Sequence, residues 1–261
     1  MFLDIFGWRV ACLIWAGLNM LFAAPVNWLA IPRHGVPAAL PQATTETAAA
    51  PPPRAAMPIL AFFFAATWFV QGAMAAHLPG LLQAAGASSS AAIAAASLVG
   101  PAQVGARIVE FQLFRSFHPI SSARFASALH PIGAAFLVAF GAPGIIAFAL
   151  LHGAGNGMIT IAKGTLPLAL FGPGGYGLRS GLLSAPARML QAASPFLFGL
   201  LLDRVGIGAV GLSAGLCLAA FASLFLLRPR RAGATHPSPV RGSGASRWTT
   251  LLSRWDHLLP R

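Results

Sequence analysis

The sequence predicts an all-α fold, a polytopic membrane bundle of about seven transmembrane helices, and three observations support this prediction. Hydrophobic residues make up 57% of the chain and charged residues only 8%, which is more apolar surface than a soluble domain could cover. Successive apolar stretches mostly have the approximately 20 residues needed to cross a hydrocarbon core of about 30 Å. None of them alternates apolar and polar residues with the period of two that a transmembrane β-barrel requires.

The first apolar stretch, Trp8–Ile31, is expected to be a lone transmembrane helix within residues 1–32. A secretory leader is the alternative, because small residues at Ala23 and Ala24 resemble a cleavage site. However, the apolar run continues beyond them, and Asp4 is unusual in a basic leader. A membrane helix is therefore the favoured interpretation.

A bundle of six closely connected helices is expected over residues 58–228, after a linker at residues 33–57. The linker is rich in Pro, Ala and Thr and has almost no large apolar residues, so we expect an extended, flexible, cytoplasmic segment. Short connections separate the six apolar segments that follow. These segments are Pro58–Leu82, Ala91–Phe111, Phe125–Phe140, Gly144–Leu170, Leu182–Leu202 and Ile207–Leu227.

The basic tail, residues 229–261, carries the spacing of an amphipathic helix. Such a helix would lie on membrane lipid at the anionic inner leaflet. A disordered basic tail with accidental periodicity is the alternative. The apolar residues of the stripe are Trp248, Leu251, Leu252, Trp255, Leu258 and Leu259.

The formal net charge of +12 is interpreted as topology rather than as a nucleic-acid interface. If the N-terminus lies outside, the outer side keeps only Arg9 and Arg204, and the other loop arginines are cytoplasmic. The positive-inside rule then places the C-terminus in the cytoplasm, with the protein in the plasma (inner) membrane. The cytoplasmic arginines would be Arg33, Arg54, Arg115, Arg124, Arg179, Arg228, Arg230, Arg231, Arg241, Arg247, Arg254 and Arg261.

Polar side chains recur at helical spacing within the apolar segments, where an ionisable group is costly and therefore indicates function. His152, Asn156, Thr160 and Lys163 share one face of their helix, and similar faces occur on three other segments. The predicted substrate-binding or gating residues are Gln71, Gln103, His152, Asn156, Lys163, Arg188 and Gln191.

Each charged group has a structural interpretation beside the functional one. Arg107 and Glu110 are three residues apart, which predicts a structural ion pair with a snorkelling arginine. Arg188 lies deeper, and either contacts substrate or gate, or hydrogen bonds to helix ends. Lys163 either contacts substrate or snorkels to the interface. His152 either carries a coupling proton or packs as a neutral side chain.

Small and helix-breaking residues indicate where helices approach and bend. Gly153 and Gly157, like Gly211 and Gly215, form small-xxx-small surfaces that let helices pack closely. Prolines within the apolar segments would kink or break their helices. These prolines are Pro79, Pro101, Pro167, Pro186 and Pro195.

An enzyme is not expected, because no His-x-x-x-His pair or carboxylate cluster occurs in the sequence. No catalytic residue, cofactor or metal site is predicted. The two cysteines, Cys12 and Cys217, lie inside apolar segments and are interpreted as small packing residues. A seven-helix receptor is disfavoured by the long linker after the first helix.

Several stretches resemble the major facilitator superfamily. Gly7-Trp8-Arg9 is similar to the start of the family's sixth helix, and residues 33–57 are similar to its central cytoplasmic loop. The later motifs are similar to stretches in one bacterial branch of the family. They are Gly100-Pro101-Ala102-Gln103-Val104-Gly105-Ala106-Arg107, Gly153-Ala154-Gly155-Asn156-Gly157, Gly164-Thr165-Leu166-Pro167 and Phe171-Gly172-Pro173.

This resemblance implies transport of a small solute by alternating access, with the site between two six-helix halves near the midplane. The chain matches helices six to twelve of that pattern, so a truncated permease lacking five N-terminal helices is expected. Its basic residues without matching buried acids would suit an anionic or polar organic solute, with a proton or another ion as coupling partner. The alternative is a non-transporting half-transporter or degenerate remnant that acts only through a partner membrane chain.

Overall fold

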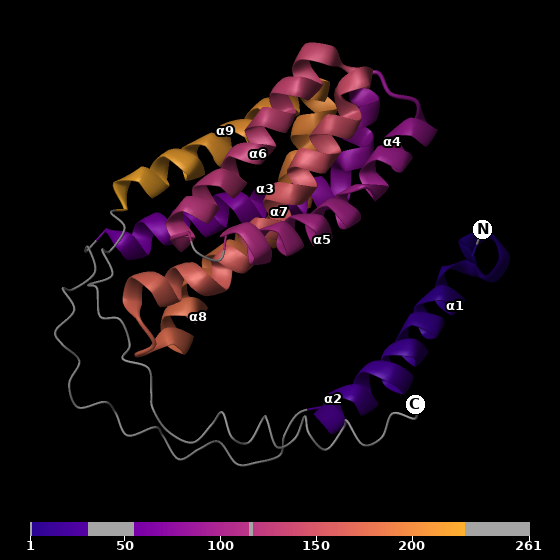
Figure 1. Cartoon of the computed structure of the whole chain (residues 1–261). Helices are drawn as coiled ribbons and strands as arrows, with labels where there is room; N and C mark the ends of the chain where they lie inside the picture. Colours follow the sequence, from indigo (N-terminus) through magenta and orange to yellow (C-terminus); the bar gives the residue numbers. More distant parts are fainter. Residues whose placement is uncertain (1, 31–54, 115–116, 228–261) are drawn as a thin grey trace, which may run out of the picture. The chain divides into compact units, whose positions relative to one another are not determined.

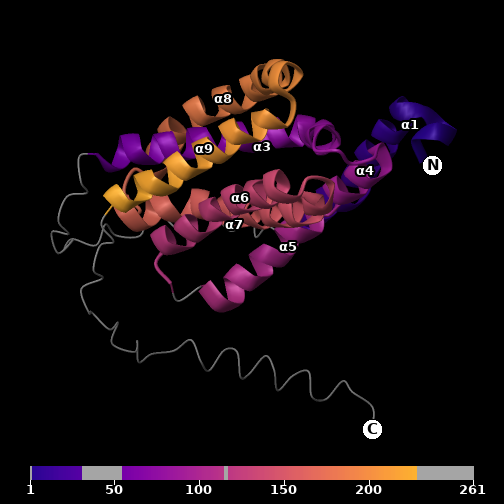
Figure 2. The same cartoon turned by 90° about the horizontal axis from the view of Figure 1, so that it is seen from above.

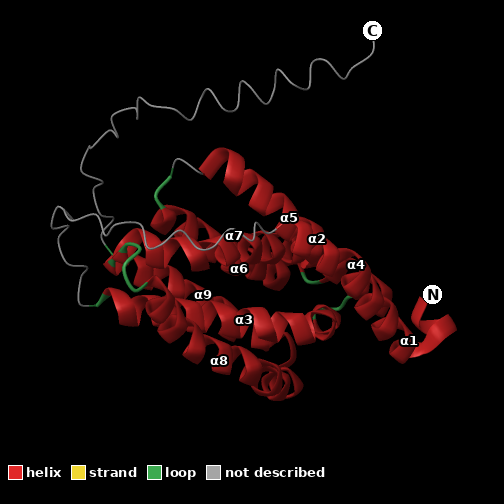
Figure 3. Cartoon of the chain, turned by 90° about the horizontal axis from the view of Figure 1, so that it is seen from below, coloured by secondary structure: helices red, strands yellow, loops and turns green. Residues whose placement is uncertain are grey.

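A computed structural model of the chain describes residues 2–30, 55–114 and 117–227, all in helices and the turns that join them (Figures 1 and 3). The predicted all-α membrane fold is confirmed. The described chain belongs to two compact units, Met1–Pro51 and Pro52–Arg261. Most of the predicted linker, through Arg54, and the whole predicted tail helix lie outside the described residues.

The first unit is a single helical rod made of α1 (Phe2–Leu18), the π-helical turn η1 (Asn19–Ala23) and α2 (Ala24–Ala30). Gly7 interrupts it with φ 72° and ψ 162°, so the regular helix begins where the sequence predicts. Its segment Cys12–Leu29 is long and apolar enough to cross a membrane.

The second unit contains the remaining helices, and α7 lies beside both α5 and α6 (Figure 2). Its other main packing pairs are α3 with α8, α3 with α9, and α6 with α9. The elements are α3 (Ala56–Ala84), α4 (Ser89–Ser97), α5 (Val99–Val109), η2 (Glu110–Phe114), α6 (Pro119–Phe140), η3 (Ala142–Gly144), α7 (Ile145–Phe171), α8 (Tyr176–Val205), η4 (Gly206–Gly208), α9 (Ala209–Ser223) and η5 (Leu224–Leu226).

Six segments of the described residues could span a membrane by length and composition. The last of them, Tyr176–Leu226, contains both α8 and α9, which are separated at Gly206, where φ is +54°. The seven apolar segments of the sequence therefore correspond to these six spans, because two segments fall in the last one.

Helix α6 begins at Pro119, six residues before the predicted start at Phe125, so the connection that precedes it is shorter than the sequence predicted. His118 is its N-cap, and the His118 Nδ1 atom accepts a hydrogen bond from the Ile120 amide at 3.2 Å. Pro119 occupies the first turn, where its missing N–H costs nothing. Burial, and then the charge of Arg124, lower the pKa of His118, which favours the neutral ring that this cap requires.

Helix α8 likewise begins at Tyr176 rather than at the predicted Leu182. Two hydrogen bonds fasten its first turn to α7: the Tyr176 hydroxyl donates to the Gly164 carbonyl at 3.1 Å, and Arg179 donates to the Phe171 carbonyl at 2.9 Å. These contacts stabilise a helical start in a stretch whose glycine and polar residues favour a loop.

Glycines let α5 approach α7 closely, as the small-residue spacing predicts. A Cβ atom at Gly153 would lie 2.7 Å from the Val99 carbonyl oxygen, and one at Gly157 would lie 2.5 Å from that of Gln103. The same prediction is wrong for Gly211, whose position has no described atom within 4 Å of an added Cβ.

The α3–α8 contact is built around a proline in α8. Pro195 has no N–H to give to the Gln191 carbonyl, and the Ser194 hydroxyl donates to that oxygen instead, at 2.8 Å. The Pro195 carbonyl is in turn 2.7 Å from the His77 Nε2 atom of α3. Gly72 of α3 has no room for a Cβ, which would lie 2.7 Å from the Gln191 carbonyl oxygen. Helix α8 thus continues through its proline while its freed carbonyl is satisfied.

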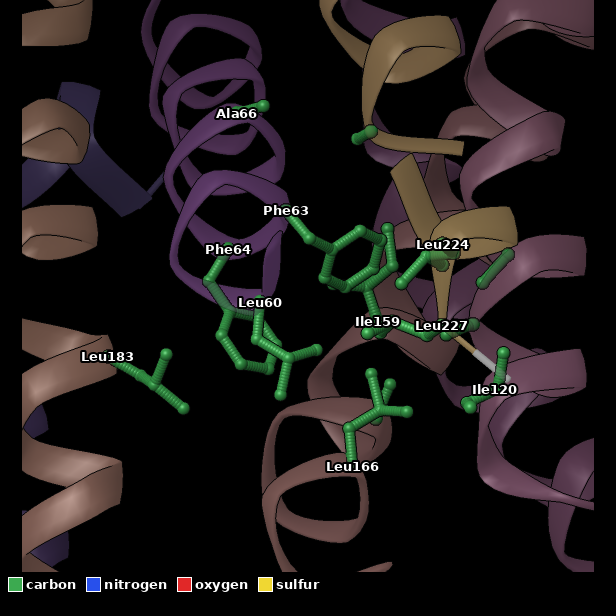
Figure 4. Close-up of a cluster of buried hydrophobic side chains, with 14 of the residues drawn as sticks. Leu60, Phe63, Phe64, Ala66, Ile120, Ile159, Leu166, Leu183, Leu224 and Leu227 are labelled. Atoms are coloured by element: carbon green, nitrogen blue, oxygen red, sulfur yellow. The ribbon is translucent and has the colours of Figure 1, made fainter. Parts of the chain in front are cut away.

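Apolar side chains fill the interior of the second unit and also cover much of its exterior. Phe63 of α3 points toward Ile159 of α7 and toward Leu224 and Leu227 at the end of the bundle (Figure 4). Many large apolar side chains, such as Val138 on α6, are instead exposed. Exposed apolar surface of this extent suits lipid rather than water.

Candidate functional site

A cavity of about 270 Å³, here called the polar cavity, lies between α3, α4, α5 and α7. Its walls include apolar residues of α3 and α4. Four polar side chains line it, and all four belong to the set predicted from the sequence: Gln71, Gln103, His152 and Asn156. Helical spacing placed these residues on shared faces of their helices, and the family resemblance led us to expect that the faces point inward together.

Two cations lie over one aromatic ring of α3, that of Trp68. The Lys163 Nζ atom of α7 lies 4.0 Å from the centre of the Trp68 ring, and the Arg188 Cζ atom of α8 lies 4.6 Å from it. The electron-rich face of an indole attracts cations, which offsets part of the repulsion between them. This arrangement places positive charge from α7 and α8 at one ring of α3.

A second cavity, here called the cationic cavity, has about 290 Å³ and lies between α3, α7 and α8. Lys163 is among the residues that line it, together with hydroxyl groups such as those of Thr160, Ser184 and Tyr176. The hydroxyls of Thr160 and Tyr176 already donate to the carbonyls of Asn156 and Gly164. The Lys163 ammonium group and the hydroxyls of Ser180 and Ser184 are the groups that this cavity offers to a ligand.

Glutamine side chains connect the cation pair to the polar cavity. The Arg188 guanidinium donates to the Gln191 Oε1 atom at 3.3 Å. The Gln191 amide donates to the Gln71 Oε1 atom at 3.4 Å, and Gln71 lines the polar cavity. The predicted residues Arg188, Gln191 and Gln71 thus form one chain of contacts between α8 and α3.

A histidine pair lies behind the polar cavity. The Nδ1 atoms of His130 in α6 and His152 in α7 are 2.9 Å apart, so one ring donates to the other. His130 Nε2 is 3.0 Å from the Ser213 hydroxyl of α9, and all three side chains are buried. This network joins three helices and packs the predicted residue His152 into a hydrogen-bonded core.

The predicted ion pair between Arg107 and Glu110 does not form. The Arg107 Nε atom instead donates to the Gly157 carbonyl of α7 at 3.4 Å. One oxygen of Glu110 accepts a hydrogen bond from the Ser122 hydroxyl of α6. Spacing of three residues within a helix permits a contact, but partners on α6 and α7 lie in better positions.

Trp68 and His130 are functional candidates that the sequence reasoning missed. Trp68 lies three residues before Gln71, so the same helical spacing places it on the polar face of α3. His130 is an ionisable residue within an apolar segment, a signal that was applied to His152 but not to this position.

No family model matches the chain, and no curated protein matches it. Within the described residues, no group of three or more His, Cys, Asp or Glu side chains is arranged to hold a metal ion. The geometry of the two cavities and the side chains around them therefore indicate what the protein does.

Proposed function

We propose that the second unit is the solute-handling half of a permease similar to the major facilitator superfamily, which moves a small anionic or polar organic solute by alternating access. The observation that carries this proposal is the placement of Lys163 and Arg188 over one indole ring. No carboxylate is among the residues that line the polar and cationic cavities. A bound anion is the natural counter-charge for such a pair.

The depth of Arg188 supports an aqueous or protein-covered pathway on this face. Arg188 lies twelve residues after Tyr176, the start of α8, which corresponds to about 18 Å of helix. Its side chain is exposed. An exposed arginine at that depth is costly against lipid, so it belongs beside water, a solute or another polypeptide.

The alternative is a half-transporter or remnant that acts only through a partner membrane chain. The same exposure of Arg188 favours a partner, because a second six-helix body could cover the face that carries it. In both versions we propose the plasma (inner) membrane, with the C-terminus in the cytoplasm, on the arginine distribution of the sequence.

Binding of simple anions to the purified chain in nanodiscs tests the proposal. Equilibrium dialysis with radiolabelled succinate and benzoate should detect binding, and Arg188→Ala should weaken it at least about tenfold, because a charge-assisted hydrogen bond is lost. Arg204→Ala is the matched control, because Arg204 is exposed at the last turn of the same helix.

If Arg188→Ala and Arg204→Ala weaken binding equally, or if neither changes it, Arg188 is not part of the solute site. If neither succinate nor benzoate binds, the proposal of an anionic solute is contradicted. A labelled organic cation such as choline would then be the next probe.

A further inference from the structure

A third cavity, of about 230 Å³, lies between η2, the start of α6 and α7. It is separate from the polar and cationic cavities, because Ile161 and Thr165 line it from a face of α7 roughly opposite to that of Lys163. Its residues are Glu110, Phe111, Phe117, Pro119, Ser122, Ile161 and Thr165. Here it is called the Glu110 cavity.

The carboxylate of Glu110 is only half satisfied in this cavity. Its side chain is 8% exposed, and the Ser122 hydroxyl donates to Oε1. Oε2 is buried and has no hydrogen-bond partner among the described residues. A proton on Oε2 would not resolve this, because the added O–H would need an acceptor. A buried oxygen without a partner is costly, so it indicates a missing donor.

The described cations near the Glu110 cavity are engaged elsewhere. Arg107 donates to the Gly157 carbonyl of α7. Arg124 of α6 donates through Nη2 to the Leu224 carbonyl at 2.8 Å and lies over the Phe225 ring, while its buried Nε has no hydrogen-bond partner among the described residues. The missing donor is therefore to be sought outside these side chains.

The composition of the walls selects an organic ammonium group rather than a metal ion. Metal cations such as Ca²⁺ or Mg²⁺ take six or more oxygen ligands, and the side chains that line this cavity supply few. The Thr165 hydroxyl is already used, since it donates to the Ile161 carbonyl at 3.2 Å. The remaining walls are hydrocarbon and aromatic, which suits an apolar body, and the rings of Phe111 and Phe117 attract a cation.

We infer that the Glu110 cavity binds the primary ammonium group of a small amphipathic amine, with the Glu110 carboxylate as the counter-ion and the apolar walls around its hydrocarbon part. This inference is independent of the proposed anion site.

The position of the cavity permits two sources of such an amine. Glu110 lies two residues before the end of one candidate span, Ser89–Gln112, and Pro119 begins the next. The cavity is therefore at the boundary between hydrocarbon and water, where both a dissolved amine and the ethanolamine headgroup of a lipid can reach it.

Isothermal titration of the purified chain in detergent with 2-phenylethylammonium tests this inference. We expect binding, and we expect Glu110→Gln to weaken it at least about thirtyfold, because one partner of a buried charge pair is lost. The uncharged analogue 2-phenylethanol should not bind. Asp203→Asn is the matched control, because Asp203 is exposed at the end of α8.

A second variant guards against loss of folding in Glu110→Gln. Thr165 is exposed and bonds only within its own helix in the described contacts, so Thr165→Phe should fill the cavity without unfolding the bundle. It should abolish ammonium binding. Equal binding of the alcohol, or unchanged binding in either Glu110→Gln or Thr165→Phe, would overturn the inference.

Native mass spectrometry separates the two sources. The chain is released from nanodiscs of phosphatidylcholine with and without phosphatidylethanolamine. If the natural chain retains phosphatidylethanolamine and Glu110→Gln loses it, the amine is a lipid headgroup. If the chain binds 2-phenylethylammonium but retains no phosphatidylethanolamine, the amine is a dissolved solute. If neither amine binds, the inference is wrong.

Discussion

Single polar side chains in this bundle are predictable to the extent that helical spacing controls them. Gln71, Gln103, His152 and Asn156 recur on the inner faces of their helices, and they do line one cavity. The predicted ion pair between Arg107 and Glu110 does not form, because each side chain has its partner on another helix. The spacing of residues within one segment does not show partners on other helices. Local patterns thus indicate which way a residue faces, whereas tertiary packing selects its partner.

The histidine pair makes a prediction at this scale. His130→Ala removes the partner of both His152 and Ser213, and it should destabilise the bundle by about 1–2 kcal/mol, the upper range for hydrogen bonds between membrane helices. Ser213→Ala should cost less, because His130 keeps its bond to His152. Thermal unfolding in detergent compares the stability of the two variants. Equal losses of stability would contradict the hydrogen bond between His130 and His152.

Helices were predictable as elements, but their ends were not. Apolar length located each of them, whereas the starts of α6 and α8 were missed by six residues each. Those starts depend on the His118 cap and on the Tyr176 hydrogen bond to α7, which apolar length does not show. The close approach of α5 and α7, in contrast, followed from glycine spacing.

The glycine contact yields a prediction for a pair of elements. A methyl group at Gly157 would meet backbone atoms of Gln103, which cannot move independently, so Gly157→Ala should separate α5 from α7 and cost about 1–3 kcal/mol. Gly211→Ala has open space and should change stability by less than about 0.5 kcal/mol. Unfolding in mixed micelles measures the free energy of unfolding of both variants. Equal losses for Gly157→Ala and Gly211→Ala would contradict the close contact between α5 and α7.

The second unit as a whole combines an apolar exterior with polar cavities between its helices. That combination suits a protein that lies in lipid and handles a polar solute inside. The sequence predicted the membrane class because 57% of its residues are hydrophobic. The side on which the C-terminus lies and the surface helix of residues 229–261 stay predictions, because they depend on the membrane and on residues beyond those described.

Alternating access by the second unit requires water to reach the polar cavity, and cysteine accessibility in native membranes tests this requirement most directly. In a background with Cys12→Ser and Cys217→Ala, Asn156→Cys places a thiol in the polar cavity, and Val138→Cys places one on the exposed apolar face of α6. We predict that a charged, membrane-impermeant methanethiosulfonate reagent modifies Cys at position 156 and leaves position 138 unmodified. No modification at 156, or equal modification at both positions, would contradict the proposed pathway.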